Sequence, residues 1–107
     1  MRGSKETSFV HSLAPGVVSR VQFIRARGKI IQFVVQLECL INNEWHSIVR
    51  YDTAHDFAHQ DILYPDGTQE KIELPFSDYN EALTFAQLDL RANWRMYRDR
   101  YERWLRK

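Results

Sequence analysis

The chain has little of what marks secreted or membrane proteins. Its 107 residues contain one cysteine, Cys39, which excludes an internal disulfide and gives no sign of an oxidising compartment. No apolar run approaches the roughly 20 residues that span a bilayer, and the N-terminal sequence lacks the apolar core of a signal peptide. We therefore expect a cytoplasmic protein with no membrane contact, in which residues 1–15 form a flexible arm.

Neither sign of charge dominates. The formal net charge is +1, so the molecule as a whole is not built to attract a polyanion. Repeats, low-complexity tracts and linkers are also missing, and 107 residues fit one domain. We expect this domain to cover residues 16–107, with a sheet over 16–75 and a helix over 77–106.

The alternation of apolar and polar side chains predicts the strands. It is clear over residues 17–25 and 31–41, as is typical of half-buried strands. Cys39 shares the apolar parity, so we interpret it as a small buried side chain and not as a catalytic thiol. Residues 59–64 and 68–74 flank the turn sequence PDG and predict a short hairpin at a sheet edge.

The register of the strand after the NNEW turn is predicted from burial, because a slip of one residue moves every side chain to the other face. A loop longer than two residues, or a bulge, places the apolar side chains of this strand on the buried face. The set expected on the buried face is Trp45, Val49 and Tyr51, beside Leu37 and Val35. The set expected on the outer face is His46, Ile48 and Arg50.

After Ser77 the apolar period becomes helical, with Ser77 or Asp78 as the expected N-cap. The apolar and aromatic stripe consists of Leu83, Ala86, Leu90, Trp94, Tyr97, Tyr101 and Trp104. A helix over 78–105 is about 40 Å long, whereas a typical strand covers about 17 Å. We therefore expect the helix to overhang the sheet, or to break near residues 89–92, and to form a homodimer through its aromatic half. The elements together predict an α+β fold, an antiparallel meander of four to five strands packed on a long C-terminal helix.

The stretch RYDTAHDFAH, residues 50–59, concentrates residue types that carry chemistry. One hypothesis is metal-free RNA cleavage, in which His55 and His59 transfer protons and Arg50 stabilises the charge on the phosphate. Tyr51 would position the substrate or donate a proton, and Asp52 would orient a histidine.

Two alternatives remain open for the same stretch. His55 and His59 are four residues apart and, on a helix, could bind a metal with Asp52 or Asp61 as a third ligand. The metal pattern is weak because no Cys/His motif accompanies it, so we predict no metal and no cofactor. In the structural alternative, Asp52 closes an Asx-turn and Tyr51 packs in the core.

Arginine is concentrated at the end of the predicted helix. Arg91, Arg95 and Arg98 fall together on a helical wheel beside the aromatic stripe, which makes them candidate contacts to RNA. The alternative is a solvated helix face, where the helix dipole favours cations near the C-terminus.

Residues 49–71, VRYDTAHDFAHQDILYPDGTQEK, resemble a segment of small prokaryotic proteins classed as a domain of unknown function. A looser resemblance links the segment to small TumE-like toxins of toxin–antitoxin modules, in which an Arg-Tyr-Asp stretch precedes a histidine-rich loop. The loop here holds fewer histidines. The resemblance covers Arg50, Tyr51, Asp52, His55 and, less closely, His59. It implies RNA as a ligand and an antitoxin-like protein as a partner.

Two functions therefore follow from the sequence. One is a toxin-like protein that binds or cleaves RNA, and the alternative is a non-catalytic, homodimeric protein-interaction module. Cleavage requires Arg50, His55 and His59 in one exposed pocket within reach of the basic helix face.

Overall fold

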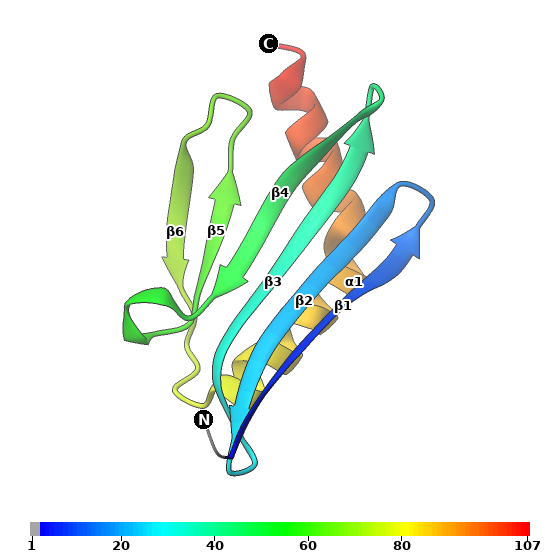
Figure 1. Ribbon diagram of the computed structural model, residues 1–107. Coiled ribbons are helices and arrows are strands. Elements are labelled where there is room, and N and C mark those ends of the chain that lie inside the picture. The colour runs from blue at the N-terminus through cyan, green and yellow to red at the C-terminus, as the bar shows by residue number, and fades with distance from the viewer. Residues whose placement is uncertain (1–2) are drawn as a thin grey trace.

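The computed structural model describes residues 3–107, apart from the side chain of His55. Six strands form one antiparallel sheet in sequence order, and a single α-helix packs behind it (Figure 1). The strands are β1 (Ser4–Ala14), β2 (Val17–Ala26), β3 (Lys29–Ile41), β4 (Glu44–Asp52), β5 (His59–Leu63) and β6 (Gln69–Glu73). A short 3₁₀ helix, η1 (Ala54–Asp56), joins β4 to β5, and α1 (Tyr79–Leu105) follows β6.

The α+β class is as predicted, but the expected count of four to five strands is too low. The additional strand is β1, which occupies residues for which the sequence indicated an arm. It pairs with β2 from Ser4 opposite Ala26 to Ala14 opposite Val17. Most side chains of β1 are exposed, since it is an edge strand. A strand without a buried face shows no clean alternation, which is why the pattern missed it.

The hairpin between β3 and β4 has the predicted bulge, and not the longer loop that was its alternative. Asn42 and Asn43 both have positive φ, 53° and 67°, as a two-residue type I′ loop requires. Ile41 therefore pairs with Glu44, and the loop is not longer. A bulge next to Leu37 then adds one residue to β4.

The bulge divides the predicted buried set. Val49 pairs with Leu37 and Tyr51 with Val35, so both are buried as predicted. Trp45 lies before the bulge, and its prediction was wrong: it is 55% exposed. The outer set is also only partly right, because Ile48 is buried and His46 turns to the helix side, where its Nδ1 lies 3.4 Å from the Tyr101 hydroxyl.

The helix is unbroken from Tyr79 to Leu105, and Asp78 caps it by accepting a hydrogen bond of 2.8 Å from the backbone N–H of Asn80. No break occurs near residues 89–92. We expected the helix to be longer than the sheet, and it is not. Strand β3 has 13 residues and spans about 40 Å at about 3.3 Å per residue, which matches the length of the helix. Most of the predicted stripe is therefore buried against the chain's own sheet, including Tyr97 and Tyr101. The homodimer itself stays a prediction, but those two side chains are not free to form it.

Cys39 lies in the core as predicted and is fully buried. Burial raises the pKa of its thiol to about 11, so the thiolate that a nucleophile needs is scarce near neutral pH. Within residues 3–107, no helix combines the length and the apolar composition that a membrane-spanning segment requires.

Two leucines of α1 provide a matched test of this packing. Leu90 is fully buried against the sheet, whereas Leu88 is exposed. We expect Leu90→Ala to lower the free energy of unfolding by about 3 kcal/mol, because it leaves a cavity at the helix–sheet interface. Leu88→Ala should change it by less than about 0.5 kcal/mol. Urea denaturation followed by circular dichroism measures both values, and equal losses would contradict the assigned helix face.

Candidate functional site

The face of the sheet that α1 does not cover holds most of the chemistry-bearing side chains. Figure 1 shows the helix behind the strands, and no other helix or strand of residues 3–107 lies across the front of the sheet. The alternation along β4 sends Arg50 and Asp52 to this uncovered face and Tyr51 to the helix. The predicted catalytic group is therefore split between two faces.

Tyr51 is part of the helix–sheet contact. Its side chain is fully buried, and its hydroxyl donates a hydrogen bond to the carboxylate of Asp89 on α1. The hydroxyl of Tyr97 donates to the same oxygen at 2.6 Å. Burial, and next the contact with Asp89, raises the pKa of Tyr51 far above its ordinary value, so the phenol stays protonated. The structure therefore assigns Tyr51 a packing role and places it away from Arg50 and Asp52.

Arg50 belongs to a polar ladder across the uncovered face, formed by Arg20, Gln36, Glu38, Ser47 and Arg50. The Arg50 Nε donates to Gln36 Oε1 at 2.9 Å. The Gln36 amide donates in turn to Glu38 at 2.7 Å and to Ser47 at 3.0 Å. Arg20 binds both oxygens of Glu38 at 3.1 Å, and this pairing lowers the pKa of that carboxyl. Each ladder member thus has a partner within the sheet.

Asp52 and His59 lie opposite each other on β4 and β5, and the register places Lys71 of β6 opposite Asp61. The Nε2 of His59 is 2.6 Å from Asp52 Oδ1 and 3.6 Å from Asp61 Oδ2. The Lys71 ammonium is 2.8 Å from the same nitrogen and 3.3 Å from Asp61 Oδ1. We call Asp52, His59, Asp61 and Lys71 the Asp–His–Lys cluster. The predicted contact between Asp52 and a histidine is present. However, His59 is 0% exposed, whereas the cleavage hypothesis requires an exposed pocket.

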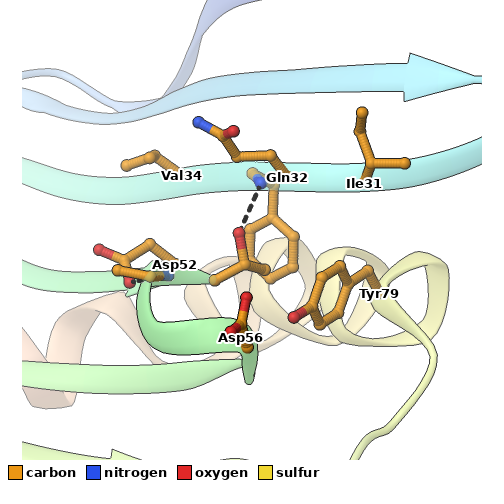
Figure 2. Close-up of a pocket in the computed structure, with 9 residues that line it drawn as sticks. Ile31, Gln32, Val34, Asp52, Asp56 and Tyr79 are labelled. Carbon is orange, nitrogen blue, oxygen red and sulfur yellow. Dashed lines mark hydrogen bonds between the residues drawn. The ribbon is translucent and has the colours of Figure 1, made fainter.

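Asp52 also lines a cleft of about 400 Å³ between β3, η1 and the start of α1 (Figure 2). Thr53 also lines the cleft and accepts a hydrogen bond of 3.1 Å from the backbone N–H of Phe33. Asp56 adds a second carboxylate to the wall, and the Tyr79 hydroxyl points toward it. Two carboxylates give this cleft an acidic lining, which repels a phosphate and favours a cation.

The remaining predicted residues do not join the cluster. The backbone of His55 lies in η1, but its side chain is outside the described part of the structure, so its catalytic role stays a prediction. Arg91 and Arg95 are exposed on α1, and Arg98 lies 3.5 Å from the carbonyl of Leu40 and 3.7 Å from Glu102. The sheet separates the helix from the uncovered face, so these arginines and the Asp–His–Lys cluster do not converge.

Sequence reasoning missed two parts of the uncovered face. Lys71 lies on an exposed edge strand, and only the register of the β5–β6 hairpin brings it to His59. Trp45 was expected in the core, yet it lines a second cavity of about 490 Å³ with Val10 and Val18. The signal available for Trp45 was the Asn-Asn dipeptide, which favours a two-residue loop.

A pair of histidines tests the structural importance of the cluster. His59→Ala removes a fully buried imidazole and leaves Asp52 and the buried Asp61 without their contact to it, so we expect a loss of about 3 kcal/mol in the free energy of unfolding. His11 is exposed on β1, and His11→Ala should change that free energy by less than about 0.5 kcal/mol. Chemical denaturation measures the difference. A His59→Ala variant as stable as the wild type would show that the cluster is not held as described.

Comparisons with known proteins bear on the family and not on the activity. No curated protein and no solved structure matches the chain. The likeness to TumE-like toxins therefore stays a prediction. A family model described as "Domain of unknown function (DUF7718)" matches residues 2–107, nearly the whole chain, and this agrees with the expected likeness to a small uncharacterised domain family. The chain belongs to the DUF7718 family.

Proposed function

We propose that the protein is a non-catalytic interaction module whose uncovered sheet face binds a second copy of the chain. The observation that carries the proposal is Trp45, a large aromatic side chain that is 55% exposed on a sheet face without a covering layer. Tryptophan is enriched among the residues that dominate binding energy at protein interfaces. Exposed apolar patches of this kind mark interaction sites.

The surroundings of Trp45 resemble the centre of an interface. Val10, which is 51% exposed, and Val18 line the cavity of about 490 Å³ beside the indole. Arg20 and Glu38 complete the cavity wall as an ion pair. An aromatic anchor beside apolar neighbours, with charged groups around them, is the usual anatomy of a protein–protein contact.

The polar ladder makes the face suitable for burial. Arg50, Gln36 and Glu38 are joined by hydrogen bonds within the sheet, and Glu38 carries its own counter-ion in Arg20. A partner that covers Glu38 therefore does not leave an unpaired carboxylate, which would be costly, whereas Arg50 is held by the neutral amide of Gln36 and requires an acceptor from the partner. Groups already held by such a network also lose little side-chain freedom on binding.

Area and charge favour a second copy as the partner. Four strands about 4.8 Å apart and about ten residues long present on the order of 600 Å², close to the roughly 800 Å² per partner of a standard interface. Two sheets can stack face to face at about 10 Å, as in β-sandwiches. With a net charge of +1, two copies do not repel each other strongly. An antitoxin-like partner is the competing occupant.

The arrangement of the predicted catalytic residues also supports this choice over RNA cleavage. His59 is enclosed and Tyr51 is on the helix side of the sheet. The Phe57 ring lies against the imidazole, 5.5 Å between centroids. A general acid–base group must come within hydrogen-bond reach of the proton that it transfers, and an enclosed imidazole does not.

Light scattering on matched variants tests the dimer. We expect a wild-type dimer at about 50 µM and a shift toward monomer in Trp45→Ala, with a Kd raised by about 30-fold, as for a hot-spot residue worth about 2 kcal/mol. Met96 is 49% exposed on α1 and serves as the control, so Met96→Ala should stay dimeric. A wild type that is monomeric at about 100 µM, or a Trp45→Ala variant that dimerises as well as the wild type, would contradict the proposal.

A toxin-like RNA function is the second candidate, and two observations favour it. Asp52 contacts His59 at 2.6 Å with Arg50 on the same sheet face, as in the cleavage hypothesis. On the helix, Arg95 stacks over the Trp94 ring at 4.5 Å, beside the exposed Arg91. Cationic side chains next to an aromatic ring suit a single-stranded nucleic acid.

Two single variants test the RNA candidate. If the protein cleaves RNA, His55→Ala should abolish turnover at an unchanged melting temperature, because a general acid–base group contributes about 10²- to 10⁴-fold to rate. If α1 binds RNA, Arg95→Ala should weaken binding and flatten its salt dependence, since one phosphate contact is lost. Gel-based cleavage and filter-binding assays measure the two effects. RNA that stays intact and unbound at about 50 µM protein would rule the candidate out.

A further inference from the structure

The Asp–His–Lys cluster gathers metal-ligating atoms at one point of the uncovered face. One ligand atom each of Asp52, His59 and Asp61 lies within 4.8 Å of the other two. His59 is fully buried and Asp61 is 2% exposed, while Asp52 opens into the acidic cleft. The set mixes an imidazole nitrogen with two carboxylates and draws on two strands, so the sheet register holds it in place.

The two closest contacts of the His59 Nε2 atom cannot both be hydrogen bonds. The Asp52 oxygen at 2.6 Å from Nε2 is an acceptor, whereas the Lys71 ammonium at 2.8 Å is a donor. One ring nitrogen carries either a proton or a lone pair, so it satisfies only one of these neighbours. A metal ion would satisfy all three ligands together, because Nε2 and both carboxylates would each donate an electron pair to it.

A second observation concerns the other ring nitrogen. The Nδ1 of His59 lies 3.4 Å from the backbone carbonyl of Phe57, which is outside the cluster. A proton on Nδ1 directed at a carbonyl leaves the lone pair on Nε2, facing Asp52 and Asp61. Histidines that bind metals are commonly fixed in this way by a carbonyl or carboxylate behind the ring.

We propose that Asp52, His59 and Asp61 bind one divalent transition-metal ion, and that Lys71 occupies the place of that ion when it is absent. One imidazole with two carboxylates suits zinc or manganese; calcium prefers oxygen ligands alone and copper(I) prefers sulfur. The Lys71 side chain is 38% exposed, so its ammonium can move out to solvent. Arg50 also lies next to the proposed site, opposite Asp61 in the register. Its Nε donates to Gln36, so this hydrogen bond does not engage the Asp61 carboxylate.

The test uses the full chain, freed of metal with a chelator and titrated with zinc chloride in a calorimeter. We expect one ion per chain in the wild type. Asp52→Asn should weaken zinc binding by at least about tenfold. Losing even a residue that only hydrogen-bonds a metal ligand lowers metal affinity by about 10- to 100-fold. Lys71→Met should tighten binding by about tenfold or more, because it removes an ammonium that competes with the ion for His59 and Asp61. Cobalt, followed by its visible absorption, provides a second readout.

Two control variants separate this site from its surroundings. Asp56→Asn changes the other carboxylate of the cleft, and His11→Ala removes an exposed imidazole; neither should alter the affinity. The proposal is overturned if neither the wild type nor Lys71→Met binds zinc with a Kd below about 100 µM. It is also overturned if folded Asp52→Asn binds as well as the wild type. Should Asp52→Asn unfold, Lys71→Met decides alone: tighter binding supports the site, and equal or weaker binding overturns it.

Discussion

One helix can cover only one face of a sheet, and the rest of this structure depends on that constraint. The stripe of α1, from Leu83 to Tyr101, is long enough to cover β3 and β4 on one side. The carboxylate of Asp89 fixes the helix there through hydrogen bonds from Tyr51 and Tyr97. The other side must therefore be soluble by itself or be covered by a partner. The polar ladder keeps the centre of this face soluble, and the exposed Trp45 indicates that a partner covers the region around it.

The order of the elements and the helix could be predicted from the sequence, because they rest on periodicity and capping within single segments. Asp78 and the stripe around Leu90 were predicted in this way. The position of Trp45 was predicted wrongly because one alternation was applied to the whole strand, whereas a bulge opposite Leu37 exchanges the faces of one half of β4. Likewise, β1 had no alternation to detect, because an exposed edge strand has no face to bury.

The candidate site shows the same division. Proximity along the chain suggested that the residues from Arg50 to His59 act together, yet strand alternation sends Tyr51 away from Arg50 and Asp52. Of the partners that His59 does acquire, Asp61 lies two residues along the same strand, whereas Lys71 comes from β6 through the hairpin register. Burying an imidazole and a carboxylate, as His59 and Asp61 are buried here, is not an economical way to stabilise a sheet. The contact of His59 with Asp52, which lines the acidic cleft, is better explained by a ligand.

The central claim is that the uncovered face is the contact surface between two copies. Its most direct test is an isotope-filtered NMR experiment on a mixture of labelled and unlabelled protein, which detects only contacts between different molecules. The account predicts contacts from the indole of Trp45 to methyl groups of Val10 and Val18 in the other copy. Intermolecular contacts from Met96 or Leu88 on the outer face of α1, or an absence of any contact to Trp45 at about 500 µM, would contradict it.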